Sequence, residues 1–348
     1  MSVSRLNLMT ALFPLRLCAF AGDKFVATAC DGIRRRLPQR RKGAKTGFHG
    51  RPLLLLLSIL FVSVVVRAQD DDDVVRVNTD LVVLNVTVTD KTGAYAKALK
   101  KGDFKIFEDG VEVPPHMIAS FSLQEAPYAA VVLLDSSGSM EARFSLARSA
   151  AIRFLDGLRP EDVAAVYRFD SRVERVQEFS GGRDLAPTAY AIRAKGMTTL
   201  NDAIVEAANT LVERPEHRKA IVILSDGMDT SSKATSEKAV EAALAVGASI
   251  YAVDMSQIEV SGSGKRLGAA QLKGFAEKTG GRFVATPGGQ ALRDAFTGIA
   301  EELGQQYTIS YRPTNQNRDG KWRTLEVKVK REDLTIRTRK GYRAPKKN

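Results

Sequence analysis

Residues Val131–Met140, which read Val-Val-Leu-Leu-Asp-Ser-Ser-Gly-Ser-Met, decide the expected fold. Four consecutive aliphatic residues are typical of a strand that is buried on both faces of a sheet. The run ends at Asp135 and continues at once into Ser137, Gly138 and Ser139. α/β folds bind their ligands at the carboxyl ends of parallel strands, so this Asp-x-Ser-x-Ser segment places three hard oxygen donors on one ligand-binding loop. Such donors indicate a small divalent cation.

Around this stretch, residues 128–303 alternate between aliphatic runs and amphipathic helical patterns. This alternation predicts βαβ units and a mainly parallel sheet with helices on both faces. The further strands are expected at 163–169, 173–179, 220–224 and 249–253. The helices are expected at 144–158, 200–211, around 240–244, 268–278 and 289–303. The strands 163–169 and 173–179 are expected to pair through a turn at Asp170-Ser171.

The two flanks of this region show the period-two alternation of half-exposed strands. Residues 74–125 contain an expected hairpin turn at Asp109-Gly110, and residues 305–343 end in an expected strand at 334–339. Neither flank can bury an apolar face alone, so both are predicted to pair into one β-sandwich, on which Trp322 packs. The predicted fold is therefore α/β, a doubly wound, mainly parallel sheet inserted into a β-sandwich. The expected parts are a leader at 1–68, a β segment at 69–127, the α/β domain at 128–304, and a β segment with a basic tail at 305–348.

The leader predicts export. Its run from Leu53 to Val66 is too short to span a bilayer comfortably and suits the hydrophobic region of a signal peptide. Val66-Arg67-Ala68 before Gln69 is an acceptable cleavage site. The expected location is the periplasm or the outside of the cell, and the alternative is an uncleaved leader that anchors the chain to the inner membrane.

Charge and cysteine content exclude several classes of protein. Residues 1–68 hold 12 of the 52 basic and 2 of the 40 acidic side chains, so the remainder is nearly balanced, with 40 basic and 38 acidic. The high isoelectric point therefore belongs to the leader and does not indicate nucleic-acid binding. Both cysteines, Cys18 and Cys30, also lie in the leader. Downstream of it, a disulfide, a zinc–thiolate site and a cysteine nucleophile are all excluded.

Two more loops carry oxygen donors at expected strand ends or helix starts. Gly196-Met197-Thr198-Thr199 opens the helix at 200–211, and Ser225-Asp226-Gly227 follows the strand at 220–224. Together with the segment from Asp135 to Ser139, these loops resemble the metal-ion-dependent adhesion site of the von Willebrand factor type A domain. That family combines Asp-x-Ser-x-Ser, a threonine and an aspartate on a doubly wound sheet.

The resemblance implies a role for each matching residue. Ser137 and Ser139 would bind a metal ion through their hydroxyls, and Thr198 takes the place of the family's threonine. Asp135 and Asp226 would bind directly or through water. The implied ion is Mg²⁺, with Mn²⁺ or Ca²⁺ as alternatives. Met197 stands where relatives commonly have glycine, which affects the shape of that loop.

The chemistry of such a site favours binding of a carboxylate. Mg²⁺ prefers six oxygen ligands, and neutral hydroxyls leave its charge poorly compensated. The ion then keeps an open position, which an aspartate or glutamate of a partner protein can fill. The predicted function is an exported, metal-dependent protein-binding module that is not an enzyme, does not bind nucleic acid, and meets the membrane only through an uncleaved leader. The flanks, around Lys101-Gly102-Asp103-Phe104 and Asp319-Gly320-Lys321, also resemble a bacterial group of exported proteins that carry this domain.

Alternative functions remain open on the sequence. The metal could serve folding alone in a structural envelope protein, or the loop hydroxyls could cap helices without a metal. Asp135 at a strand end also resembles a phosphatase nucleophile, although such enzymes need an acid where Ser137 stands. Asp229 could assist a second cation or be a solvated loop acid. His116 and His217 have no motif around them and are expected at the surface.

Overall fold

The computed structural model describes residues 81–123, 126–182, 196–256, 263–285 and 289–346. The chain divides into two compact units, Met1–Val74 and Val75–Asn348, and all described residues belong to the second unit. The predicted export signal, its cleavage site and both cysteines lie outside the described residues. Within the described ranges, no helix is long and apolar enough to cross a membrane.

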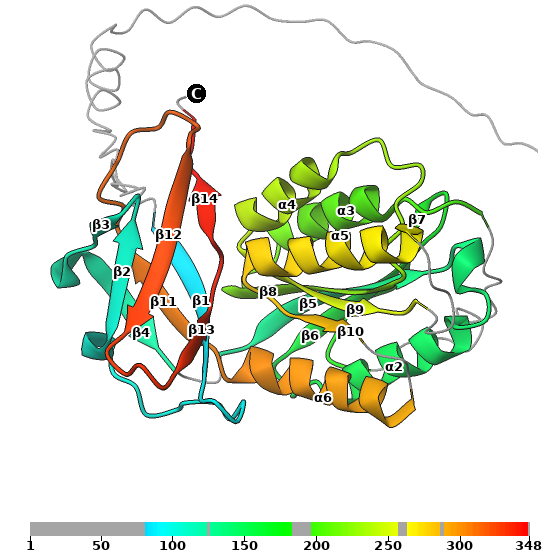
Figure 1. Ribbon diagram of the computed structural model, residues 1–348, viewed down its shortest axis with the longest axis horizontal. Helices are drawn as coiled ribbons and strands as arrows, with labels where there is room; N and C mark the ends of the chain where they lie inside the picture. Colours follow the sequence, from blue (N-terminus) through cyan, green and yellow to red (C-terminus); the bar gives the residue numbers. More distant parts are fainter. Residues whose placement is uncertain (1–80, 124–125, 183–195, 257–262, 286–288, 347–348) are drawn as a thin grey trace, which may run out of the picture. The chain divides into compact units, whose positions relative to one another are not determined.

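The α/β part of the second unit is built on one six-stranded sheet (Figure 1). Its elements in chain order are β5 (Tyr128–Asp135), α2 (Phe144–Asp156), β6 (Val163–Phe169), β7 (Val173–Ser180), α3 (Leu200–Val212), β8 (Arg218–Ser225), α4 (Ser236–Ala245), β9 (Ala248–Asp254), α5 (Ser263–Thr279), β10 (Phe283–Ala285) and α6 (Gly289–Gly304). The strand order is β10-β9-β8-β5-β6-β7. All neighbours are parallel except β6 and β7, which confirms the predicted antiparallel pair. The short strand β10 is not predicted from the sequence.

Strand β5 lies in the middle of this sheet, and all of its residues are buried. Successive side chains of a strand point to opposite faces, so a strand is buried throughout only when both faces are covered. Val131 and Leu133 pack with α3, α4 and α5, whereas Val132 and Leu134 pack with α2 and α6. Figure 1 shows these two helical layers on either side of the sheet. The predicted doubly wound architecture is confirmed.

The two flanks form two antiparallel four-stranded sheets, of order β13-β1-β11-β4 and β14-β12-β2-β3. Their strands are β1 (Val82–Thr89), β2 (Phe104–Glu108), β3 (Val111–Glu112), β4 (Ile118–Ser122), β11 (Tyr307–Tyr311), β12 (Trp322–Val329), β13 (Thr335–Arg337) and β14 (Gly341–Arg343). Each sheet combines strands from both flanks, since β1 pairs with β11 and β2 with β12. Both sheets contribute to one shared hydrophobic core. The predicted sandwich with an inserted α/β domain is therefore present.

The flanks contain three local features for which the sequence makes a prediction: the β2–β3 hairpin, the last strand and the position of Trp322. Asp109 and Gly110 both have positive φ, 49° and 81°, and join β2 to β3 as the predicted two-residue hairpin. The strand expected at 334–339 is shorter, and the chain then crosses to the other sheet as β14, which was not predicted. Trp322 packs on the sandwich, but on its outer face over Gly341, with 41% of its surface exposed.

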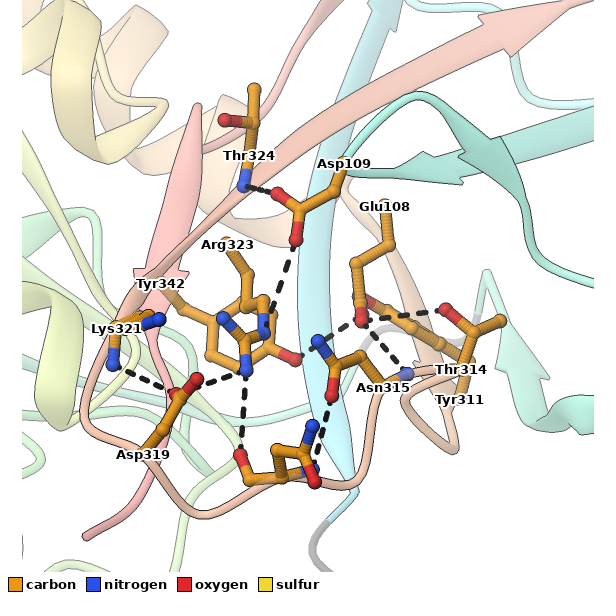
Figure 2. A network of polar contacts seen from close by, with 11 residues as sticks. Glu108, Asp109, Tyr311, Thr314, Asn315, Asp319, Lys321, Arg323, Thr324 and Tyr342 are labelled. Carbon is orange, nitrogen blue, oxygen red and sulfur yellow. Dashed lines mark hydrogen bonds and ion pairs between the residues drawn. The ribbon is translucent and has the colours of Figure 1, made fainter.

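A buried carboxylate organises one end of the sandwich core (Figure 2). Glu108 accepts hydrogen bonds from the hydroxyls of Tyr311 (2.7 Å) and Tyr342 (3.1 Å) and from the backbone N–H of Asn315 (3.4 Å). Nearby, the buried Arg323 donates to Asp319 at 2.9 Å. These bonds satisfy polar groups that would otherwise destabilise an apolar core.

Polar side chains also join the sandwich to the α/β part. Arg218 at the start of β8 is fully buried and donates to the Thr308 hydroxyl at 3.1 Å and to the Leu303 and Gln306 carbonyls at 3.2 and 2.5 Å. Thr308 alternates along β11 with the core residues Tyr307 and Ile309, and this contact covers it as well. The two parts are therefore connected by satisfied hydrogen bonds as well as by the chain.

Candidate metal site

Asp135 is positioned by the end of β5 and is fully buried. Its Oδ1 accepts the backbone N–H of Ser137 at 2.9 Å, and its Oδ2 accepts the hydroxyl of Ser225, at the end of β8, at 2.5 Å. The neighbouring Ser136 hydroxyl donates to the Phe169 carbonyl, at the end of β6, at 3.1 Å. The ends of three adjacent strands are thus fastened to one another at Asp135.

The two serine hydroxyls of the motif lie together. Ser137 is buried and Ser139 is exposed, and their Oγ atoms are 3.1 Å apart. A short 3-10 turn at Gly138–Met140 brings the second hydroxyl back to the first. The pair therefore offers two oxygen atoms at a point where the buried strand end meets solvent.

The loop that contains Thr198 is held against both other loops. The N–H of Gly138 donates to the Gly196 carbonyl at 3.2 Å, which ties it to the serine loop. Thr198 is buried, its N–H donates to the Thr230 hydroxyl at 2.8 Å, and its carbonyl accepts the Thr230 N–H at 2.9 Å. Gly196 adopts φ +97°, a conformation that other residues rarely take.

Asp226 follows β8 and is partly exposed. Its Oδ1 accepts the backbone N–H of Met228 at 3.3 Å. Gly227 has φ +81°, and a Cβ atom there would lie 2.3 Å from the carbonyl oxygen of Gly268 in α5. A glycine is therefore required for Asp226 to lie where it does.

The loops that carry Asp135, Ser137, Ser139, Thr198 and Asp226 form a site that we call the cup. Its electrostatics suit a cation. The pKa of Asp135 is raised to about 6, mainly because the side chain is buried; the negative charge of Asp226 also raises it, and hydrogen bonds from Ser137 and Ser225 act in the opposite direction. The buried Asp135 and the partly exposed Asp226 thus repel each other, and a positive charge near them would stabilise both. Among the described residues, no cluster of three or more His, Cys, Asp or Glu side chains could hold a metal. Any ion here would therefore depend on the hydroxyls, as the sequence pattern requires.

The structure brings the three predicted loops to one edge of the sheet. Ser137 and Ser139 are in direct contact, Asp135 is bonded to the serine loop, and backbone hydrogen bonds tie the loop of Thr198 to the other two. The donor set of hydroxyls and carboxylates fits a hard divalent cation.

Asp229 has a role that the sequence reasoning missed. Its Oδ2 accepts the N–H of Asn201 in the first turn of α3 at 2.8 Å and the Ser232 hydroxyl at 2.6 Å. It is therefore a half-buried cap of α3, and the interpretation as a solvated loop acid is wrong. Asn201 lies 28 residues before Asp229 in the sequence, so no local signal could reveal this contact. His116 and His217 are exposed, as predicted.

The fold and the cup together define a doubly wound α/β domain with oxygen donors at the carboxyl edge of its sheet. Residues 130–228 match the family model of the von Willebrand factor type A domain, so the chain contains a domain of this family. The comparison with curated proteins gave no match.

Several solved bacterial structures are similar to part of this chain. BatB from Bacteroides thetaiotaomicron is 19% identical with a TM-score of 0.41, over 51% of this chain and 98% of that one. The PilB minor pilin from Streptococcus sanguinis is 15% identical with a TM-score of 0.40, over 53% of this chain and 63% of the pilin. The vWF domain of the type V pili tip protein Mfa5 from Porphyromonas gingivalis is 15% identical with a TM-score of 0.42, over 51% and 94%.

Proposed function

We propose that this protein is an exported, metal-dependent protein-binding module. Its cup would hold a divalent cation, with Mg²⁺ preferred and Mn²⁺ or Ca²⁺ as alternatives, through the side chains of Asp135, Ser137, Ser139, Thr198 and Asp226. When bound, the ion supplies a positive charge and an open coordination position. A carboxylate of a partner protein can occupy that position. The partner is therefore a protein that presents an aspartate or glutamate.

The observation that carries this proposal is the paired serine hydroxyls above a buried aspartate. Ser137 and Ser139 hold their oxygens 3.1 Å apart, and Asp135 beneath them lacks the solvation that a carboxylate prefers. Neutral hydroxyl ligands quench little of a cation's charge, which leaves it able to attract a further anion.

The surroundings favour recognition over a role in folding alone. Met197 and Leu267 are 54% and 68% exposed. Met197 precedes Thr198, and Leu267 precedes Gly268, which contacts Gly227. Exposed apolar side chains beside a charged site are typical of interaction surfaces, where a partner covers them.

The same geometry disfavours the phosphatase alternative. A nucleophilic carboxylate must reach its substrate, but both oxygens of Asp135 accept hydrogen bonds and the side chain is fully buried. Assay of a generic phosphate ester, with the protein and with Asp135→Asn, tests this directly. Turnover that disappears in the variant would favour the enzyme.

Export and domain organisation complete the proposal. The leader at 1–68 would direct the chain to the periplasm or outside the cell, or anchor it if uncleaved. The segments at 69–127 and 305–348 would support the domain at 128–304. The sequence features of the leader support this part, and N-terminal sequencing of the mature protein tests it.

Titration calorimetry with MgCl₂ tests the metal site. We expect saturable binding to the full chain and a loss of affinity of about tenfold or more in Ser139→Ala, because one metal ligand is removed. Ser149→Ala is the matched control, since Ser149 is an exposed serine on α2, away from the cup. Equal affinity in both variants would contradict the assignment. If Mg²⁺ instead raises the melting temperature by many degrees and partner binding ignores chelator, the folding-only role is favoured.

A further inference from the structure

A concave surface that contains none of the candidate metal ligands lies between α4 and the edge of the sandwich. Its volume is about 570 Å³, and its walls include residues of α4, β12 and β14. Such a volume is typical of ligand-binding clefts. The cavity is mostly apolar and is open to solvent, so the fold itself does not fill it.

Trp322 and Leu81 form part of its apolar wall and are 41% and 40% exposed. The indole of Trp322 is held on one side by Gly341, where a Cβ atom would lie 2.4 Å from the ring. The ring is therefore fixed in place while much of it faces solvent. Fixed aromatic surfaces of this kind supply binding energy at a low cost in conformational entropy.

The backbone of β14 forms part of the same wall, opposite α4. β14 is the terminal strand of its sheet. The residues just before and after it, Lys340 and Ala344, form hydrogen bonds toward β12. The Ala344 N–H donates to the Lys321 carbonyl at 2.8 Å, and the Lys340 carbonyl accepts from the Leu325 N–H at 2.9 Å. Antiparallel pairing alternates, so the N–H and C=O groups of Gly341 and Arg343 point away from β12.

The cavity also has excess positive charge. Lys238, Arg339 and Arg343 line it, and the one acidic residue among its lining residues, Glu241, pairs with Arg343. Arg339 donates to the Val83 carbonyl at 2.7 Å, but its Nε is buried without a partner. Within the described ranges, no ion pair joins Arg339 or Lys238 to a carboxylate. Arg339 is half-buried, and a cation in such a place is destabilising without a counter-charge, which a bound carboxylate would supply.

We propose that this groove binds an extended peptide segment of a partner protein that carries carboxylates next to apolar residues. The segment would lie along the edge strand β14, place apolar side chains against Trp322, and direct a carboxylate to Arg339 and Lys238. The site needs no metal and is independent of the function proposed for the cup.

The chain contains a single tryptophan, so the fluorescence of Trp322 reports directly on this groove. The probe is a capped peptide of alternating Asp and Val, titrated into the full chain, with an Asn-Val peptide as its uncharged match. We expect the Asp-Val peptide to shift the emission to shorter wavelength in a saturable, salt-sensitive manner. The Asn-Val peptide should bind about tenfold more weakly, because it cannot compensate the cations.

Variants locate the binding. Lys238→Gln should weaken binding by about threefold and Ala242→Glu by about tenfold, the latter because it adds a negative charge to the groove wall. Lys238 is exposed and so can be changed without affecting folding, and Lys273→Gln on α5 is the matched control. No emission change with the Asp-Val peptide, an equal response to both peptides, or binding that ignores both groove variants would overturn the proposal. Binding abolished by chelator would also overturn it, since the peptide would then occupy the cup. Metal affinity measured in the same variants should be unchanged, which separates this test from that of the cup.

Discussion

Gly227 shows how a single residue shapes the candidate metal site. It combines a φ of +81° with direct backbone contact to α5, so that a Cβ atom would lie 2.3 Å from the Gly268 carbonyl oxygen. Gly110, in the β2–β3 hairpin, has the same φ of +81° but nothing within 4 Å of the corresponding position. The two glycines therefore separate the cost of backbone conformation from the cost of a steric clash.

We expect Gly227→Ala to lower the free energy of unfolding by about 3 kcal/mol, and Gly110→Ala by about 1 kcal/mol. Both variants carry the conformational penalty, but only the first must displace the backbone of α5. Urea unfolding followed by circular dichroism measures the difference. Equal losses in the two variants would show that the loop after β8 moves freely and does not hold Asp226 in place.

The candidate ligands were predictable from the sequence because each lies next to a strongly patterned element. Asp135, Ser137 and Ser139 directly follow an aliphatic run, and parallel strand ends meet at one edge whatever the details of packing. Asp229 was not predictable in the same way. Its partner Asn201 is 28 residues away, and the contact depends on how two loops fold over each other.

Helix α3 depends on this distant cap. In its first turn, the Asn201 N–H donates to the Asp229 carboxylate. The adjacent Asp202 of α3 also stabilises the loop that contains Asp229, because its carboxylate accepts the Ala234 N–H at 2.8 Å. The N-terminus of a helix leaves backbone N–H groups unsatisfied and carries a partial positive charge. A carboxylate placed there stabilises both.

We expect Asp229→Ala to cost about 1–2 kcal/mol of stability, through the loss of the cap on α3. The matched control is Asp294→Ala, because Asp294 is an exposed aspartate on α6 whose carboxylate accepts only from a neighbouring exposed Gln290 within the described contacts. Thermal unfolding of both variants measures the effect. A loss no larger than in the control would mean that Asp229 is a solvated acid after all.

Among the secondary-structure elements, the long and periodic ones were predicted, whereas the short strands β10 and β14 were not. The aliphatic run of β8 and the helical faces of α3 and α6 carry their own signals. β10 and β14 have three residues each, and their strand conformation comes from pairing with β9 and β12. Gly341 even disfavours a strand by itself, and it is needed there because Trp322 covers it.

At the scale of the whole molecule, Glu302 links the α/β part to the sandwich. It is buried in α6 and accepts hydrogen bonds from Thr87 of β1 (3.1 Å) and Tyr251 of β9 (3.0 Å), and it forms an ion pair with Arg337 of β13. The pairing of the two flanks could be predicted from their alternation. This junction could not, because its members come from four separate elements.

We expect Glu302→Ala to lower the free energy of unfolding by about 3 kcal/mol, since it leaves Arg337 and two hydroxyls without their shared acceptor. Glu301→Ala is the control, because the adjacent Glu301 is exposed. Urea unfolding monitored by Trp322 fluorescence, which reports on the sandwich, and by far-ultraviolet circular dichroism should show both transitions shifting together. A shift in only one signal would show that the two parts unfold independently.

Buried tyrosines make the stability of the whole molecule sensitive to alkaline pH. Burial raises the pKa of Tyr128, Tyr251 and Tyr342, and of Tyr311, whose hydroxyl also donates to Glu108 (Figure 2). Below about pH 10 these groups are protonated in both the folded and the unfolded chain. Above it, the unfolded chain releases its protons first. The unfolding free energy should therefore fall as the pH rises above about 10.

Two buried arginines act in the opposite direction. Burial lowers the pKa of Arg218 to about 10, and it also lowers the pKa of Arg339, so their destabilising charges are relieved as the pH rises. The four tyrosines outnumber them, and we expect a net loss of stability between about pH 10 and about pH 11. Melting temperatures across this range, with tyrosinate absorbance recorded in parallel, measure it. The expectation fails if the melting temperature stays constant, or if all tyrosines of the folded protein ionise near their ordinary pKa of about 10.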